Sequence, residues 1–243
     1  MKSPTCPSWI PVRYIFTFLA FIGFVFNYTL RVNINLVITS MVNHTALNDT
    51  DNYKLNSTLK YDGPFEWDSV VTNDVVGLFF AGYMVFQMPG GRLAEVIGGK
   101  KVFTKTFLHI FRQILLFQVL AIAMGGVSLL TLLIPEAAKL TGTSGYPYVL
   151  VIIRFLMGIC EAGTFPCITS MLARWAPESE RSTMSTFIMA GSQAGTIVGF
   201  YVSGLLQDQW GWEAVFYIEG GACFVWLIFW ILLASDTPAT HPT

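Results

Sequence analysis

Six stretches of about 20 mostly apolar residues recur along this chain, and they limit its possible folds more than any other feature. A helix of that length crosses the hydrocarbon core of a bilayer. Charged residues make up only 12% of the chain, against about 25% in soluble domains. We therefore predict an all-α membrane protein with six transmembrane helices. The predicted spans are residues 14–39, 70–91, 114–134, 148–172, 183–206 and 212–234.

Two features of the polar segments predict the same orientation. The loop 42–69 holds three N-x-[ST] sequons, at Asn43, Asn48 and Asn56, and such acceptors are glycosylated on the outer or lumenal side. Short cytoplasmic loops collect Lys and Arg, which places residues 1–13 and both termini in the cytoplasm. The inner side would then hold Lys2, Arg13, Arg92, Lys100, Lys101, Lys105, Arg112, Arg174 and Arg181, and the outer side only Lys54, Lys60 and Lys139.

Residues 104–121, which lead into the third span, fit the pattern of a span poorly. They carry His109, Arg112 and Gln113 among apolar residues. We predict an amphipathic helix at the inner membrane interface. The second hypothesis is an insertion that relatives lack, which sequencing of the transcript would decide.

Two ionisable side chains, Arg154 and Glu161, lie inside the apolar run Tyr148–Leu172. A charge in the middle of a bilayer costs at least about 2.5 kcal/mol, so such residues face a bundle interior or a watery cavity. Their spacing puts them on one helix face about 10 Å apart along the axis, so we expect each to meet a partner on another helix or a solute. Glu161 is either a proton-coupling site or half of a permanent ion pair.

Arg31 lies deep in the first span, within Asn27–Ile38 (NYTLRVNINLVI). Its guanidinium stays protonated and offers a planar fork of five donors, which suits a carboxylate or a phosphate. Arg31 therefore either binds an anionic solute or pairs with a carboxylate such as Glu161.

Small residues follow each other at every fourth position of the fifth span, at Gly191, Gly195 and Gly199, continued by Ser203. This spacing lets helices approach closely in lipid, so we predict a packing face first and a moving interface second. Glu219, near the start of the sixth span, is either a second coupling acid or a carboxylate solvated at the interface.

Residues 91–101 (GRLAEVIGGKK) combine glycines, an acid and a basic cluster after the second span. We predict a tight turn in a positively charged inner loop. Elsewhere, the four cysteines and three histidines have no metal-site or disulfide spacing, and no nucleophile–base pair stands out. We expect no enzyme activity, no metal, no nucleic-acid partner and no cofactor beyond a coupling proton or sodium ion.

Several of these segments resemble the major facilitator superfamily. The loop 91–101 is similar to its signature G-x-L-x-D-R-x-G-R-[RK], with Glu95 at the acidic position and Lys100 at the last basic one, and Gly91 and Gly98 are its glycines. The pattern R-x-x-x-G-x-x-E-[GA]-x-x-[FY]-P, followed by W-x-P-x-x-E-R-S, resembles the anion:cation symporter family of sialin, the vesicular glutamate transporters and the sodium–phosphate cotransporters. It occupies residues 154–166 and 175–182. Insect inorganic phosphate cotransporters look most similar.

The resemblance implies a symporter for organic anions or inorganic phosphate that is driven by protons or sodium. It implies that Arg31 and Arg154 bind the substrate anion, that Tyr83 lines the cavity and that Glu161 is the coupling carboxylate. Vesicular glutamate transporters carry a histidine where this chain has Val76, and several members carry one where it has Ile168. The resemblance therefore implies coupling through Glu161 and a substrate other than glutamate.

The family folds as two six-helix halves around the solute, and this resemblance covers the N-terminal half, 14–234. Residues 235–243 are similar to the start of the central cytoplasmic linker. The implied partners are a small anion, the bilayer and a C-terminal half or full-length relative, in a plasma, lysosomal or vesicular membrane. The alternative function is a transport-inactive short isoform or fragment that modulates full-length transporters.

Overall fold

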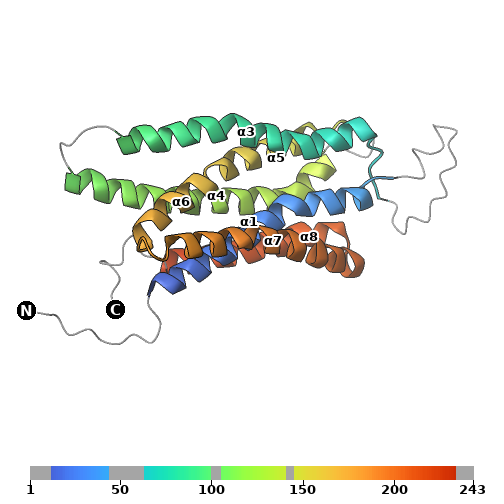
Figure 1. The fold of residues 1–243 in the computed structure, drawn as a ribbon. Coiled ribbons are helices and arrows are strands. Elements are labelled where there is room, and N and C mark those ends of the chain that lie inside the picture. Colours follow the sequence, from blue (N-terminus) through green and yellow to red (C-terminus); the bar gives the residue numbers. More distant parts are fainter. Residues whose placement is uncertain (1–11, 44–62, 100–104, 141–144, 234–243) are drawn as a thin grey trace, which may run out of the picture.

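The computed structural model describes residues 12–43, 63–99, 105–140 and 145–233, with side chains described except at 12, 88–99, 105–119, 174, 175 and 233. These residues form a bundle of long helices (Figure 1), as predicted for an all-α membrane protein. The helices are α1 (Val12–Met41), α3 (Ser69–Gly99), α4 (Lys105–Leu140), α5 (Tyr148–Ala162), α6 (Thr164–Trp175), α7 (Arg181–Trp210) and α8 (Trp212–Leu233).

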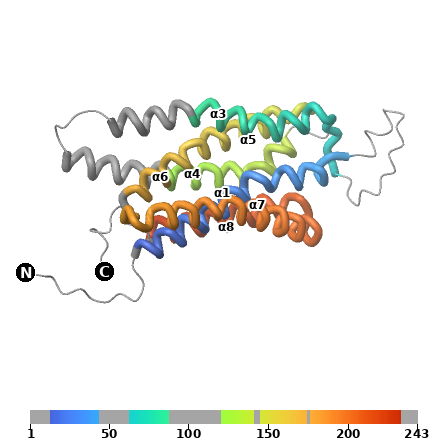
Figure 2. Tube along the Cα trace, viewed as in Figure 1, coloured from blue at the N-terminus to red at the C-terminus, as the bar shows by residue number. Residues whose placement is uncertain are grey.

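Successive spans run in opposite directions, with α5 and α6 forming one span. As a result α1 begins and α8 ends at the same end of the bundle (Figures 1 and 2), which we call the Val12 end. Within the described residues, five segments are long and apolar enough to cross a membrane: Arg13–Met41, Ser69–Gln87, Leu120–Leu140, Tyr148–Ala173 and Trp212–Leu232. The helix α7 is also 30 residues long but less apolar, because Gly, Ser, Thr and Gln occupy its interior.

Two sequence-based predictions about helix ends are wrong. The helix α3 continues to Gly99, so the backbone of 91–99 is helical rather than a tight turn; a glycine inside a helix costs only about 1 kcal/mol. The helix α4 runs unbroken from Lys105 to Leu140, so there is no separate interfacial helix before the third span. It also continues past Pro135, a residue that usually ends or kinks a helix.

The fourth span is interrupted at Gly163, where α5 gives way to α6. Pro166 follows in the first turn of α6, where its missing N–H removes no intrahelical hydrogen bond. The interruption comes two residues after Glu161. It was not predicted, although Gly163 and Pro166 are residue types that often interrupt a helix.

The helix contacts repeat between the first three and the last three spans. α1 packs on α7 as α3 packs on α5, and α4 packs on α5 as α8 packs on α1, while α4 and α8 pack on each other. Exchanging the first three spans for the last three leaves this pattern unchanged. The strongest helix contacts therefore follow two similar three-span units, the arrangement of repeat-built transporters.

Glycines make the closest helix crossings. A Cβ at Gly191 would lie 2.6 Å from the Phe21 carbonyl oxygen of α1, and one at Gly195 would overlap the Val25 carbonyl. A Cβ at Gly199 would lie 3.0 Å from the Val32 side chain. Lipid offers apolar side chains no net gain from burial, so close backbone packing of this kind is what holds membrane helices together.

At the other end of the bundle, residues 63–68 fold back onto the end of α1. The Asn43 N–H donates to the Phe65 carbonyl at 2.7 Å, and the Phe65 ring stacks on Trp67 at 4.5 Å. Asp68 then caps α3 by accepting the Val71 N–H at 2.9 Å. Of the three sequons, only that at Asn43 begins within the described residues; Asn48 and Asn56 lie outside them.

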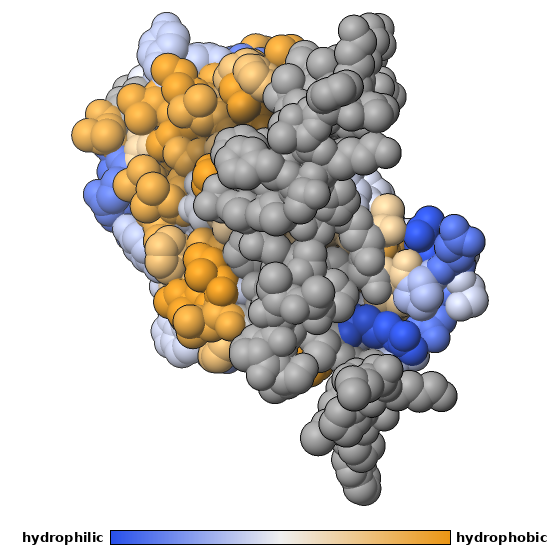
Figure 3. Space-filling view, turned by 90° about the vertical axis from the view of Figure 1, so that its left-hand side faces the viewer, coloured by the Kyte–Doolittle hydropathy of each residue, from blue (hydrophilic) through white to orange (hydrophobic). Residues whose placement is uncertain are grey.

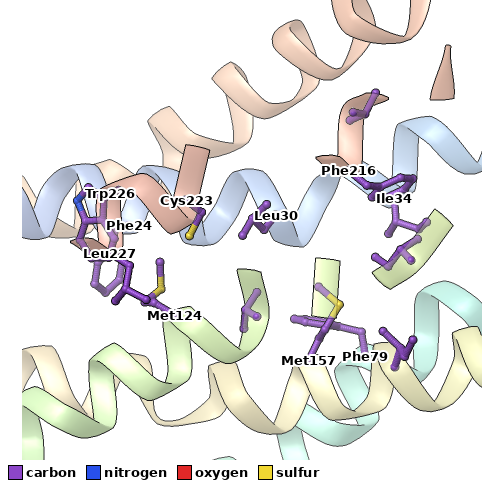
Figure 4. Close-up of a cluster of buried hydrophobic side chains, with 14 of the residues drawn as sticks. Phe24, Leu30, Ile34, Phe79, Met124, Met157, Phe216, Cys223, Trp226 and Leu227 are labelled. Atoms are coloured by element: carbon purple, nitrogen blue, oxygen red, sulfur yellow. The ribbon is translucent and has the colours of Figure 1, made fainter. Parts of the chain in front are cut away.

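Apolar side chains lie both on the outer surface of the bundle and in its core. Seen from the Val12 end, hydrophobic residues gather on the flank of the described part (Figure 3), as a lipid-facing surface requires. Inside, side chains from α1, α3, α4, α5 and α8 form one core, in which Leu30, Phe79 and Met157 are fully buried (Figure 4). The few polar side chains within this core therefore stand out as candidates for function.

Candidate functional site

Arg31 and Glu161 meet in the interior of the bundle, between α1 and α5. The Nε of Arg31 lies 3.4 Å from the Oε1 of Glu161, and the side chains are 11% and 2% exposed. The contact is ionic but not a regular hydrogen bond: within the described residues, Nε and Nη2 of Arg31 and both oxygens of Glu161 have no hydrogen-bond partner. The pair therefore keeps unused donors on the arginine side.

Aromatic rings surround the guanidinium of Arg31. Its Cζ lies 4.5 Å from the ring centre of Tyr83 and 5.1 Å from those of Tyr28 and Phe79. Phe80 is slightly farther, at 6.0 Å. Each desolvated contact of this kind contributes about 2 kcal/mol, which offsets part of the cost of holding a charge at this depth.

Arg154 is almost completely buried, with 1% of its surface exposed. Its Nε donates to the Val75 carbonyl at 3.4 Å, and its Cζ lies 4.9 Å from the centre of the Phe79 ring. The same ring contacts Arg31, so Phe79 lies against both guanidinium groups. Arg154 is thus the more deeply buried of the two arginines, and the Arg31 side chain is 11% exposed.

A close crossing of α3 and α5 determines where these groups lie. A Cβ at Gly158 would overlap the Phe79 carbonyl and lie 2.8 Å from the Tyr83 amide nitrogen, and one at Gly82 would overlap the Phe155 carbonyl. With glycines at 82 and 158, the two backbones touch one turn from Arg154. The α3 rings are thereby brought against both arginines.

The structure brings together four of the residues that the sequence singled out: Arg31, Tyr83, Arg154 and Glu161. Tyr83 is half-buried and its hydroxyl accepts a hydrogen bond from Gln87 Nε2 at 3.4 Å. The loop residues Gly91, Glu95 and Gly98 have no described side chains, and Lys100 lies outside the described residues altogether. Within the described parts, no three His, Cys, Asp or Glu side chains gather as a metal site.

Two residues of importance were missed or misplaced by the sequence analysis. Phe79 was not predicted to contribute, because nothing in an apolar span distinguishes one phenylalanine from its neighbours. Glu219 is not solvated at an interface: it is 4% exposed and hydrogen-bonded to Asn33 and Ser203. The sequence did contain a sign of this buried polar contact: Asn33 places a side-chain amide among the aliphatic residues of the first span.

Comparison with known proteins agrees with this architecture. Residues 20–243 match the Major Facilitator Superfamily. The chain belongs to the major facilitator superfamily. This confirms the resemblance proposed from the sequence motifs, and membership in a superfamily of transporters rather than enzymes agrees with the prediction that the chain is not an enzyme.

Within the superfamily, the chain is similar to vesicular glutamate transporters. It is 31% identical to vesicular glutamate transporter 2 of Homo sapiens over 245 residues, covering all of this chain and 38% of that protein. It is 32% identical to vesicular glutamate transporter 1 of Xenopus laevis over 234 residues, covering 96% of this chain and 36% of that one. The chain thus spans about 38% of the length of the curated relatives it matches. This superfamily member is accordingly a multi-pass membrane protein related to anion transporters.

Proposed function

We propose that this chain forms an anion-binding part of a secondary transporter, coupled to a cation gradient through Glu161. The observation that carries the proposal is the ion pair between Arg31 and Glu161 at 3.4 Å inside the bundle. Both an anionic solute and Glu161 would compete for the same guanidinium. Binding of one therefore depends on the charge of the other.

Protonation of Glu161 removes the negative charge that faces Arg31. The guanidinium, whose Nε and Nη2 have no hydrogen-bond partner in the described part of the chain, can then direct its donors to a carboxylate or phosphate. A proton and an anion would in this way be bound together, which is the requirement for symport. The substrate remains a small organic anion or inorganic phosphate in this proposal.

Arg154 and Tyr83 have supporting parts in the proposed site. Arg154 would add a second positive charge beside Phe79, and because it is almost fully buried, a solute would reach it only if that ring moved. Tyr83 covers Arg31 at 4.5 Å and is more exposed than Phe79. Its ring would line the approach to the arginine.

Anion binding to the purified chain in nanodiscs tests the proposal, with radiolabelled phosphate and glutamate as probes. Arg31→Ala should lower affinity at least about tenfold, since it removes a charge-assisted hydrogen-bonding partner, and Arg31→Lys should lower it less. The matched control is Arg13→Ala, which breaks a partly exposed ion pair with Glu180 of 3.1 Å. Equal anion affinities in Arg31→Ala and the unaltered chain would contradict the proposal.

Transport itself is measured as uptake into proteoliposomes, because binding alone does not establish movement across the membrane. The chain is reconstituted alone and together with the remaining part of a vesicular glutamate transporter, since it spans about 38% of such a relative. Uptake that depends on Arg31 in either preparation supports the proposal. Anion depletion without accumulation inside the vesicles would contradict it.

A further inference from the structure

A second buried polar centre lies where α1, α7 and α8 meet, and we call it the Glu219 centre. Glu219 Oε2 accepts a hydrogen bond from Asn33 Nδ2 at 3.1 Å, and Glu219 Oε1 accepts one from the Ser203 hydroxyl at 2.7 Å. The three residues come from three helices and are each at most 4% exposed. The proposed anion site does not use this cluster.

The Glu219 carboxylate has no cationic side chain against it among the described residues. Both of its hydrogen bonds come from neutral groups, and none of the ion pairs found there includes it. From α1, Arg31 is directed to Glu161 instead. From α4, the neutral Ser128 hydroxyl donates to the adjacent Gly220 carbonyl. A buried carboxylate is costly unless a counter-charge accompanies it.

An unused oxygen lies next to this carboxylate. Asn33 is fully buried, and its Oδ1 has no hydrogen-bond partner among the described residues. Because Nδ2 of the same carboxamide bonds Glu219, Oδ1 lies at the edge of the same cluster. A carboxylate has about four lone-pair positions, and only two of those on Glu219 are used.

The chemistry of these groups favours a metal cation over a proton. Carboxylate, carbonyl and hydroxyl oxygens are the ligands of hard cations, and the single negative charge matches a monovalent ion. A proton on Glu219 would use only one of the lone pairs that remain free on its carboxylate. A metal ion would instead use the lone pairs that remain free on Glu219 and Asn33.

We propose that Glu219, Asn33 and Ser203 form a sodium-binding site, separate from the centre of Arg31 and Glu161. Sodium bound there would join α1 and α8 to α7, one turn beyond Gly199 on the glycine face of α7. It would stabilise the folded bundle by mass action. The proposal concerns sodium binding alone and does not depend on anion transport.

The test is the thermal unfolding midpoint of the purified chain in detergent at pH 8, with sodium chloride replaced stepwise by choline chloride. Sodium should raise the midpoint of the unaltered chain in a saturable manner. Glu219→Gln, which keeps the shape and removes the charge, should weaken the apparent sodium affinity at least about tenfold, because ligand charge sets cation affinity. The matched control is Glu213→Gln on the same helix, whose partner Lys139 lies 2.7 Å away; it should keep the full response.

The following results would overturn the sodium proposal or separate it from the proposal on anion binding. Equal midpoints in sodium and choline, or an unchanged sodium response in Glu219→Gln, overturn the proposal. A midpoint that responds to pH and not to sodium assigns a proton to Glu219 and overturns it as well. Should Glu219→Gln fail to fold, Ser203→Ala replaces it, and an unchanged sodium affinity in that variant is equally decisive. Arg31→Ala should keep the sodium response, which separates this proposal from that on anion binding.

Discussion

The backbone carbonyl of Phe79 on α3 lies directly against the Cα of Gly158 on α5, where any side chain at 158 would overlap it. This contact holds the Phe79 ring within 5.1 Å of the Arg31 guanidinium and 4.9 Å of that of Arg154. A packing feature of two helices thus determines the spacing of two buried charges. The substitutions described next distinguish the effect of helix packing on stability from the effect of the buried charges on anion binding.

Gly158→Ala should destabilise the bundle. The added Cβ would force α3 and α5 apart, and overpacking of this kind costs about 1 to 3 kcal/mol. The measurement is unfolding by heat or by added SDS in detergent micelles. Gly77→Ala on α3 is the matched control, because a Cβ there meets nothing within 4 Å, and it should be neutral or stabilising by up to about 1 kcal/mol. Equal stability of the two variants would show that the crossing tolerates a wider separation.

Arg154→Met should keep or raise stability while weakening anion binding. Methionine fills a similar volume without a charge to desolvate, and replacing buried charges by apolar residues is often neutral or stabilising. One unit charge about 10 Å away at an effective dielectric constant near 20 is worth about 1.7 kcal/mol, so the anion affinity should fall about fifteenfold to twentyfold. Parallel unfolding and anion-binding assays measure both quantities. Lost stability with full anion affinity would assign Arg154 a structural role only.

Glu161→Gln should abolish the pH dependence of anion binding. In the unaltered chain, lowering the pH protonates Glu161 and frees Arg31, so anion affinity should rise as pH falls. Glutamine stays neutral, so the affinity of the variant for glutamate, whose carboxylates stay ionised near neutral pH, should be high and constant across the same pH range. Titrations of anion binding at several pH values measure this. Glu180→Gln, whose partner is Arg13 at 3.1 Å, is the control and should keep the pH dependence; a variant with the same pH profile as the unaltered chain would exclude Glu161 as the coupling acid.

The sequons test the proposed orientation of the membrane spans. If the loop 42–69 faces the outside or the lumen, the chain expressed in eukaryotic cells should shift in electrophoretic mobility on treatment with a glycosidase. Replacing Asn43, Asn48 and Asn56 by Gln should remove that shift. The triple variant should still insert, because Gln keeps the polarity of Asn and the backbone N–H of residue 43 can still donate to Phe65. A glycosidase-insensitive chain, with the loop shown by labelling to be cytoplasmic, would reverse the topology.

The spans were predictable because a bilayer imposes a length and an apolar composition that a single sequence displays. Helix ends were less predictable. Pro135 lies inside α4, and the glycines of 91–99 lie inside α3, since a helix can tolerate one missing hydrogen bond or a few flexible residues when the rest continues. The break at Gly163 was missed for another reason: the prediction weighed only the hydrophobicity of the span and not the breaker residues Gly163 and Pro166 within it.

The sequence predicted which charged residues form the candidate site, but it did not predict which residues surround them. Arg31, Arg154 and Glu161 stand out because ionisable residues in a span are costly. Which of them pair depends on how the helices are rotated and how closely they approach. The identification of Phe79 and of the contact between Asn33 and Glu219 therefore required coordinates, because a helical pattern alone does not specify neighbours on other helices.

In the proposed anion site, the Phe79 ring, which contacts both guanidinium groups, would make recognition stepwise. An anion would contact Arg31 first and would reach Arg154 only after the ring had rotated aside. Solutes with one small negative group would stop at the outer arginine, whereas those with a second group in reach could continue inward. Selectivity would then depend on whether an anion can rotate the uncharged Phe79 ring aside, and not only on how many charges the anion carries.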